Sequence, residues 1–256
     1  MLHALRFLEA VLPATGLRVV ASKPPGWKNG FKHTFLATND EVVAEAKRLD
    51  AAGVTNYIAL ATYADPQAGR TATNTVELQC FWLDVDYKHY ASPEEACADA
   101  ARLDAVLGQP SLRVQSGGGL HAYWVLRAPL PTAQWKAIAE AFQATWQGLG
   151  IKADPISADA ARVLRIPGTH NFKEEYGTPR EVLLETFDDV SYDAVAFAKK
   201  LGAAKASTKK AIPIAPVAIP AGLYDSNDDL GAGLERRPSH LAECVKNCRQ
   251  MQHAYA

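Results

Sequence analysis

The chain has 256 residues, of which 48% are hydrophobic and 21% charged, so it is long enough for one large domain or two small ones and apolar enough for a packed core. A net charge of -1 and an isoelectric point of about 6.7 argue against a strongly basic nucleic-acid binder. No apolar run approaches the ~18 residues that cross a bilayer, and the N-terminus lacks the basic start and cleavage site of a signal peptide, so a cytoplasmic location without membrane contact is the default expectation.

The N-terminal part of the chain predicts a mixed α/β arrangement. It opens with an amphipathic helix, because four leucines share one helical face: Leu2, Leu5, Leu8 and Leu12. A loop rich in Pro and Gly separates the first two strands, and Thr38 or Asn39 can cap the helix that follows them. The expected elements are strands at 17–22, 31–37 and 56–62, a helix at 40–52 and a polar loop at 64–75.

The first loop and its flanking strands are basic and aromatic. Residues 10–39 contain no acidic side chain. Lys23, Trp27, Lys28 and Lys32 are candidate contacts to a single DNA strand, because phosphates pair with cations and bases stack on aromatic rings. The alternative is a solvated loop whose rings are tucked into the core.

Residues 77–166 predict a more regular unit. The order of elements is β-α-β-β-α-β, the split βαβ arrangement of ferredoxin-like and RNA-recognition-motif-like (RRM-like) sheets, and the expected fold class is α+β. Its first helix has a clear start, with Ser92 as N-cap and Pro93 at the first helical position. The expected strands are 77–86, 112–115, 120–126 and 162–166, the helices are 92–107 and 132–149, and a strand at 181–186 and a helix at 192–201 follow.

Composition suggests the domain boundaries. We expect a catalytic domain at 1–202, with an N-terminal α/β part at about 1–76 and an RRM-like part at about 77–202. Residues 203–222 are rich in Ala, Lys and Pro and predict an extended linker. Residues 223–256 predict the start of a C-terminal helical region, truncated from a longer parent protein.

The four cysteines indicate no metal centre. Cys80 lies in an apolar strand-like run and Cys97 in a helical run, so both predict buried free thiols. Cys244 and Cys248 are four residues apart and can share a helix face, but the paired Cys/His spacing typical of zinc sites is absent from the sequence.

Two carboxylates stand close together at the end of strand 77–86. Side chains two residues apart in a strand point to the same side, so Asp84 and Asp86 face one way. Such a pair repels unless a cation lies between its members, and its oxygens suit Mg²⁺ or Mn²⁺. A solvated strand end and the Asp-x-Asp pair of metal-dependent sugar transferases are the alternatives. Lys88, just beyond the pair, predicts only a solvated side chain.

A glycine-rich turn joins the two middle strands of the unit. Glycines 117–119 bring backbone N–H groups within reach of a ligand, and Ser116, Gly118 and Gly119 are candidate nucleotide contacts. His121 heads the next strand and can donate a hydrogen bond to a phosphate oxygen. The alternative is a plain hairpin turn with a structural histidine.

A third segment combines a carboxylate with three cations. Asp154 precedes a proline in a loop after a helix, and Arg162, Arg165 and Lys173 follow it. Arg162 and Arg165 are three residues apart, so a bulge or turn is needed for both to reach one site. Lys173 lies beyond a Pro-Gly turn and can fold back toward the same place. Asp159 is a second acid nearby, and no feature of the sequence favours it.

Together the three segments resemble the archaeo-eukaryotic primase superfamily, especially the primase-polymerases of phages and plasmids. Its members carry an acidic pair on a strand, a Ser/Gly-rich turn ending in His, and a later acid followed by basic residues. The resemblance covers about residues 1–200, and the run Arg-Ile-Pro-Gly-Thr-His-Asn-Phe-Lys at 165–173 is similar to the phage and plasmid version. Gly119 is a departure, because many relatives have Ser two residues before the motif His.

The resemblance implies a primase-like catalytic core and DNA-directed primase/polymerase (nucleotidyltransferase) activity, in a bacterial host cytoplasm. It implies two Mg²⁺ or Mn²⁺ ions about 3.5–4 Å apart, a single-stranded DNA template, NTP or dNTP substrates and a helicase domain downstream in the parent chain. The implied metal-binding and catalytic residues are Asp84, Asp86 and Asp154, and the implied nucleotide-binding residues are Ser116, Gly118, Gly119, His121, Arg162, Arg165 and Lys173.

Three other functions compete with this hypothesis. A non-catalytic replication initiator of the same fold would bind an origin without synthesis, but retention of all three acids argues against it. A non-catalytic RRM-type domain needs stacking aromatics on its central strands, where Asp84 and Asp86 would repel phosphates. A sugar transferase leaves the basic segment around Arg162, Arg165 and Lys173 unexplained.

Overall fold

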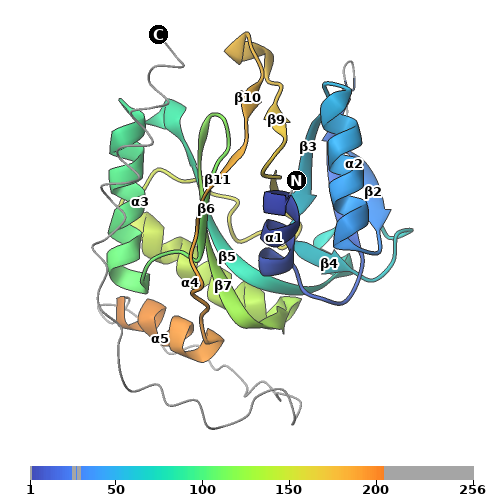
Figure 1. The fold of residues 1–256 in the computed structure, drawn as a ribbon. Helices are drawn as coiled ribbons and strands as arrows, with labels where there is room; N and C mark the ends of the chain where they lie inside the picture. The colour runs from blue at the N-terminus through green and yellow to red at the C-terminus, as the bar shows by residue number, and fades with distance from the viewer. Residues whose placement is uncertain (1, 25–26, 28–29, 205–256) are drawn as a thin grey trace.

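The computed structural model describes residues 2–24, 27 and 30–204, and it contains two main antiparallel sheets (Figure 1). One sheet has four strands in the order β2-β1-β3-β8, and the other has five in the order β11-β6-β7-β5-β4. The predicted helical region 223–256 and all but the first two residues of the predicted linker 203–222 lie outside the described residues.

The four-stranded sheet gathers the N-terminal strands. It consists of β1 (Arg18–Lys23), β2 (Lys32–Leu36), β3 (Thr55–Ala59) and β8 (Val163–Arg165). Helix α2 (Asn39–Ala51) packs on one face of it. This helix starts where predicted, because Thr38 and Glu41 form a reciprocal capping box that satisfies two free backbone N–H groups.

The five-stranded sheet forms the centre of the molecule. Its strands are β4 (Ala61–Tyr63), β5 (Thr75–Asp86), β6 (Leu112–Gln115), β7 (Gly119–Pro131) and β11 (Leu183–Phe187). Helices α3 (Pro93–Leu107), α4 (Thr132–Gly148) and α5 (Ala194–Ala204) pack on one face, and α1 (Leu2–Val11) packs on the other (Figure 1). The alternation along β7 reflects this, since Tyr123 contacts Phe7 of α1 and Trp124 contacts Phe142 of α4.

Short elements complete the described chain. Three single-turn 3₁₀ helices occur at Ala72–Asn74, Tyr87–His89 and Glu174–Tyr176. The segment after β8 forms a small hairpin of β9 (His170–Asn171) and β10 (Arg180–Glu181), which the sequence did not predict. Both strands have only two residues, too few to show a period-2 pattern.

The prediction that residues 162–166 close the RRM-like sheet is wrong. The strand exists as β8, but Leu164 pairs with Ile58 of β3 in the four-stranded sheet. The place beside β5 is taken by β4. The single strand predicted at 56–62 is in fact two strands, and the chain passes from one sheet to the other at Leu60. The α+β class with an RRM-like sheet and an N-terminal α/β part is confirmed, and the continuous segment β3–β4 connects the two sheets.

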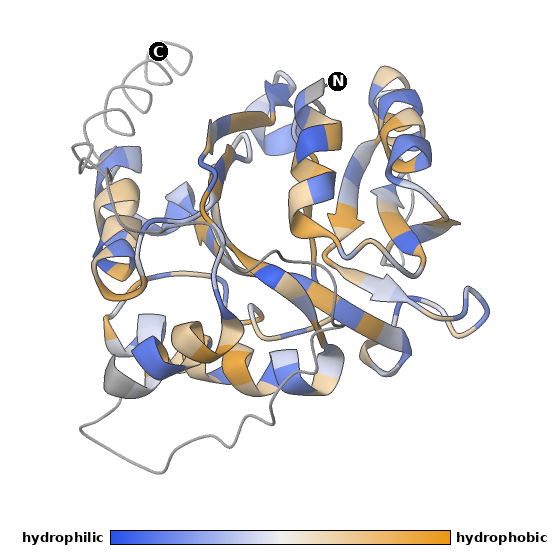
Figure 2. Cartoon of the chain, turned by 60° about the horizontal axis from the view of Figure 1, so that its bottom comes forward, coloured by the Kyte–Doolittle hydropathy of each residue, from blue (hydrophilic) through white to orange (hydrophobic). Residues whose placement is uncertain are grey.

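One hydrophobic core joins both sheets and helices α1 to α5 of the described residues. Figure 2 shows apolar and polar residues alternating along the helices and the long central strands. Cys80 and Cys97 are buried free thiols, as predicted. Within residues 2–24, 27 and 30–204, none of the helices combines the length and apolar composition that crossing a bilayer requires.

Candidate active site

The acids at the end of β5 face the histidine of the neighbouring strand. In the antiparallel β5–β7 pair, Asp84 is opposite His121 and Asp86 is opposite Gly119. His121 Nε2 lies 3.5 Å from Asp84 Oδ1. Strand register therefore joins the first two predicted segments into one site.

The third predicted acid is tied to the first by the backbone. Asp154 lies in the loop after α4, and its N–H donates to the carbonyl oxygen of Asp84 at 2.8 Å. Asp154 Oδ1 accepts from the N–H of Ile156 at 2.8 Å, which orients the side chain. Asp84, Asp86 and Asp154 all line one pocket of about 160 Å³. Asp159 instead caps the following turn.

Arg162 contacts two of the three acids. Its Nη2 lies 3.2 Å from Asp84 Oδ2 and also pairs with Asp154 Oδ2. Arg162 stands just before β8, in a turn in which its N–H donates to the carbonyl of Asp159 at 3.0 Å. This turn, and not a bulge within the strand, allows Arg162 and Arg165 to line the same pocket.

Arg165 is the most deeply buried cation of the pocket, at 5% exposure. It is opposite Tyr57 in the β3–β8 pair, donates from Nη2 to the Tyr57 hydroxyl at 3.1 Å, and lies 4.7 Å from the centre of that ring. Burial lowers the pKa of Arg165, but a guanidinium stays charged in proteins. Its Nη1 is buried and has no hydrogen-bond partner among the described residues. A buried, charged donor without a partner favours an anionic ligand in this pocket.

The glycine turn requires a close approach of backbone segments. A Cβ atom on Gly119 would overlap the carbonyl oxygen of Val85, and one on Gly118 would overlap the Tyr176 hydroxyl. Ser116 Oγ donates to the carbonyl of Gly119 at 3.1 Å, so this hydroxyl closes the turn itself. Ser116 and Gly118 line the pocket, and Gly119 supports it from beside β5.

The β9–β10 hairpin supplies pocket residues to which the sequence analysis gave no role. Asn171 is 2% exposed, and its Nδ2 donates to the carbonyl of Ser116 at 3.1 Å, which ties the hairpin to the glycine turn. Tyr176 lines the pocket beside the predicted Lys173, whose side chain is 39% exposed. Asn171 lies within the family-like run at 165–173 and could have been found there. Tyr57 and Tyr176 carried no signal, because strand pairing and the hairpin place them.

His121 is a buried, neutral hydrogen-bonding group. It is 4% exposed, and its Nδ1 lies 3.3 Å from the Tyr123 hydroxyl. Burial lowers the pKa of His121; Asp84 opposes this effect, and Arg165 and Arg162 add to it. Burial also raises the pKa of Tyr123 well above its usual value, so the phenol stays protonated and can donate to Nδ1. In the tautomer that this bond selects, Nε2 carries the proton and faces Asp84.

The three acids have the ligand chemistry of a hard divalent ion. Carboxylate oxygens suit Mg²⁺ and Mn²⁺, and Asp84, Asp86 and Asp154 line the same pocket. Asp86 pairs with Lys88 Nζ at 2.8 Å, so Lys88 is an ion-pair partner as well as a solvated side chain. Among the described residues, no three His, Cys, Asp or Glu side chains are gathered as a formed metal site. The acids fit the ions in ligand chemistry, and Arg162 lies between Asp84 and Asp154.

The predicted DNA contacts lie on the four-stranded sheet and its first loop. Strand register places the exposed Lys23 on the sheet face that also carries Tyr57 of the pocket. Trp27 is 45% exposed. Lys32 is exposed too, but its register places it on the opposite face, with α2. Lys28 lies outside the described residues.

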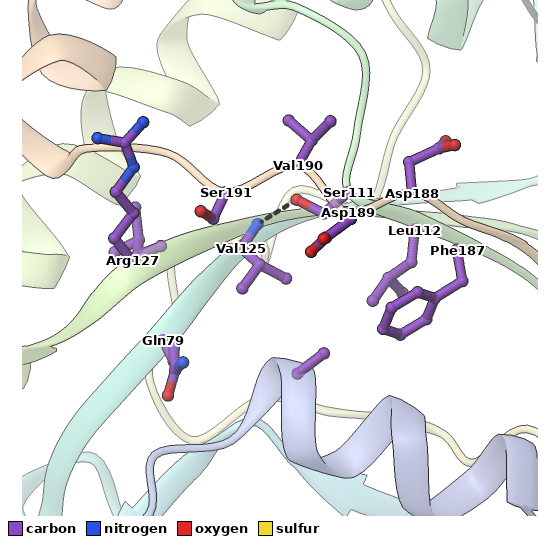
Figure 3. A pocket seen from close by; sticks show the side chains of 12 residues that line it. Gln79, Ser111, Leu112, Val125, Arg127, Phe187, Asp188, Asp189, Val190 and Ser191 are labelled. Atoms are coloured by element: carbon purple, nitrogen blue, oxygen red, sulfur yellow. Dashed lines mark hydrogen bonds between the residues drawn. The ribbon is translucent and has the colours of Figure 1, made fainter. Parts of the chain in front are cut away.

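A second and larger pocket lies further along the central strands, away from the acids. It has a volume of about 370 Å³ and is lined by Gln79 and Val125. Gln79 is five positions along β5 from Asp84, so this pocket is roughly 15 Å from the acids. Figure 3 shows Asp189 and Arg127 pointing in different directions there. None of its lining residues has a buried polar side-chain atom without a partner, so we do not assign the active site here.

Several known proteins share part of the sequence or the fold of this chain. No family model matches the chain. A curated "Replication protein" from Clostridium perfringens is 31% identical over 137 residues, which cover 52% of this chain and about a third (33%) of that protein.

Three solved structures share the fold. The AEP domain of the Primase-Polymerase (PrimPol) of cyanophage S-2L superposes with a TM-score of 0.56 at 18% identity, over 78% of this chain and 96% of that one. Primase RepB' superposes with a TM-score of 0.53 at 18% identity, over 80% of this chain and 62% of that one. The catalytic domain of RepB' in complex with initiator DNA superposes with a TM-score of 0.52 at 17% identity, over 80% of this chain and 95% of that one. The resemblance seen in the sequence motifs is confirmed at the level of fold: this chain has the fold of the archaeo-eukaryotic primase catalytic domain.

Proposed function

We propose that this chain is a DNA-directed primase/polymerase that makes primers, extends DNA or does both in the replication of a phage or plasmid. One observation carries the proposal: a single pocket brings three carboxylates together with three basic side chains. The carboxylates are Asp84, Asp86 and Asp154, and the cations are Arg162, Arg165 and Lys173.

The mixture of charges points to a metal-bound polyphosphate. A pocket for phosphates alone gains nothing from three carboxylates, which repel the ligand. A pocket for a metal ion alone gains nothing from buried arginines, which repel the ion. A nucleoside triphosphate that carries divalent ions satisfies both sets of groups at once.

The basic residues have distinct parts in binding the triphosphate. Arg165 is fixed against Tyr57 and keeps Nη1 for a phosphate oxygen. Lys173 is more exposed and adds a flexible charge from the hairpin. His121 is neutral and offers Nε2–H as a hydrogen-bond donor beside Asp84.

The acids are the expected ligands of two Mg²⁺ or Mn²⁺ ions. Such ions, when bound, activate the attacking 3′-hydroxyl and neutralise charge on the triphosphate and the departing pyrophosphate. The chain's own contribution is to hold Asp84 and Asp154 side by side through the 2.8 Å backbone hydrogen bond, with Asp86 two residues further along β5.

A DNA template fits the surface next to this pocket. The RepB' catalytic domain was solved with initiator DNA, and we extend DNA binding to this chain. Lys23 and Trp27 are the proposed contacts among the described residues, whereas Lys32 lies on the opposite face of the sheet. The Phe31 ring lies 5.3 Å from the Tyr57 ring, so aromatic surface continues from the first loop to the pocket. Stacking on such rings binds single strands with little sequence preference.

The test is nucleotide incorporation by the 256-residue chain. A single-stranded DNA template, Mg²⁺ or Mn²⁺, and labelled NTPs or dNTPs are supplied with and without a primer, and products are separated on a gel. Metal-dependent products without a primer establish a primase, and products only with a primer establish a polymerase. DNA binding without any product contradicts the proposal and supports the non-catalytic initiator.

A further inference from the structure

The strongest unexplained contact of the pocket is that of Arg162 with two acids. Its Nη2 lies 3.2 Å from Asp84 Oδ2 and pairs with Asp154 Oδ2. These two carboxylates are the ones that the backbone hydrogen bond holds side by side. A guanidinium nitrogen therefore lies between oxygens that the proposed function gives to a divalent ion.

The backbone around Arg162 is fixed, so only its side chain can change partners. Its N–H donates to Asp159, and its carbonyl accepts from the N–H of Leu60 at 3.3 Å. The carbonyl of the preceding Ala161 accepts from Arg70. These bonds hold the Cα position while four rotatable side-chain bonds stay free to redirect the guanidinium.

The guanidinium is only partly satisfied where it lies. Its Nε is buried and has no hydrogen-bond partner among the described residues. The side chain is 22% exposed, and those of Asp84 and Asp154 are 19% and 29% exposed. Partly exposed ion pairs of this kind contribute modestly to stability, so a doubly charged ion can compete for the same oxygens.

We propose that Arg162 is an internal counter-cation that a divalent ion displaces, so that metal binding releases Arg162 to contact the triphosphate. This inference rests on the proposed function and adds a coupling between its two ligands. Arg162 lowers the affinity of the acids for metal in the absence of nucleotide. Once displaced, its guanidinium can bind phosphate oxygens in the same pocket, so metal and nucleotide strengthen each other's binding.

Arg165 provides a matched control within the same pocket. Arg162→Gln and Arg165→Gln each remove one positive charge near the acids. Of these two arginines, Arg162 has a direct ion pair with Asp84 and Asp154, and Arg165 has none. Both variants therefore lose general electrostatic repulsion of the metal ion. Arg162→Gln also loses the direct competition between the guanidinium and the metal ion for the carboxylate oxygens.

The experiment is a titration of the 256-residue chain with Mn²⁺ alone, followed by calorimetry or by the electron paramagnetic resonance of free Mn²⁺. We expect Arg162→Gln to bind Mn²⁺ roughly 1.5- to fivefold more tightly than wild type, the range of one partly exposed ion pair, and Arg165→Gln to gain clearly less. Adding a dNTP should increase the Mn²⁺ affinity of the wild-type protein more than that of Arg162→Gln. Arg162→Lys keeps the charge without the planar fork and should bind Mn²⁺ with intermediate affinity.

Three outcomes overturn claims at different levels. Equal Mn²⁺ affinity in wild type and Arg162→Gln, or equal gains in the two Gln variants, overturns the inference and leaves the proposed function standing. If a thermal melt shows that Arg162→Gln does not fold, the Mn²⁺ affinities of Arg162→Lys and wild type are compared instead. Equal affinities of these two proteins overturn the inference. Wild type that binds Mn²⁺ no better than Asp84→Asn overturns the proposed function itself.

Discussion

His121 lies directly across the β5–β7 pair from Asp84, with Nε2 at 3.5 Å from Oδ1. Antiparallel register, and not closeness in sequence, creates this contact. The glycine turn sets that register, because Gly119 is opposite Asp86 and allows the two strands to approach there. The acids and the turn therefore form one structural unit, whose parts respond together to substitution.

Gly119→Ala tests this unit. The added methyl group overlaps the carbonyl oxygen of Val85, so we expect a loss of about 3 kcal/mol in the free energy of unfolding, together with loss of activity. Gly148→Ala in α4 is the control, since nothing lies within 4 Å of its added methyl. The control should be stabilised by about 0.4–1 kcal/mol in urea denaturation. Equal stability of the two variants would refute the close approach.

Loss of charge should lower the stability of the fold strongly at one buried arginine and change it little at another. Arg18 donates to four backbone carbonyls and to Asn39, so Arg18→Met should destabilise the fold by at least about 3 kcal/mol. Arg165 has a buried Nη1 without a partner among the described residues, so Arg165→Met should change stability by less than about 1 kcal/mol.

Nucleotide binding should instead depend more on Arg165 than on Arg18. Arg165→Met should raise the KM for the nucleotide by roughly 10- to 100-fold, the cost of a hydrogen bond to a charged group. Thermal or urea unfolding and steady-state kinetics measure the two effects. An Arg165→Met variant that is severely destabilised but binds nucleotide normally would show that Arg165 is structural.

His121 should make the folded state sensitive to acid. Because burial lowers the pKa of His121 below 6.5, the unfolded chain takes up a proton as pH falls through about 6.5 and the folded chain does not. The stability contributed by neutral His121 is therefore present above that pH and is lost progressively below it. Urea denaturation at several pH values should give a shallower acid slope for His121→Gln than for wild type. Burial also lowers the pKa of His33, but His33 is unchanged in both proteins. Identical slopes would contradict the assignment.

Single-strand binding should depend on which sheet face a residue occupies. Trp27→Ala should weaken DNA binding by roughly tenfold, within the range for loss of one stacked base, and Lys23→Ala should lower its salt dependence. Lys32→Ala should have a smaller effect, because Lys32 lies on the α2 face near Glu45, whose pKa is lowered mainly by its hydrogen bond with Arg48 and also by Lys32. Fluorescence anisotropy with a labelled oligonucleotide at several salt concentrations measures all three. An effect of Lys32→Ala as large as that of Trp27→Ala would contradict binding of single-stranded DNA on the sheet face that carries Tyr57.

The sequence predicted the parts of the site that depend on local rules. Strand alternation put Asp84 and Asp86 on one face, and the glycines marked the turn that brings His121 opposite them. Helix starts were also visible, because Ser92 and Thr38 both act as caps. These features need only a few neighbouring residues.

The remaining features depend on contacts distant in sequence. The three-residue strand β8 gives no local sign of which sheet it joins, and it pairs with β3. Tyr57 enters the site only through that pairing, opposite Arg165. The contact of Asn171 with Ser116 likewise depends on where the β9–β10 hairpin lies.

The most direct test of the proposed active site compares three conservative variants in the incorporation assay. Asp84→Asn and Asp86→Asn remove carboxylates of the pocket, and Asp99→Asn removes one from an exposed ion pair with Arg102 on α3. We expect Asp84→Asn and Asp86→Asn to fold and to lose metal-dependent nucleotide incorporation by at least about 10²-fold, and Asp99→Asn to keep it. Full incorporation by Asp84→Asn or Asp86→Asn would contradict the assignment of these acids as the metal-binding centre of a nucleotidyltransferase.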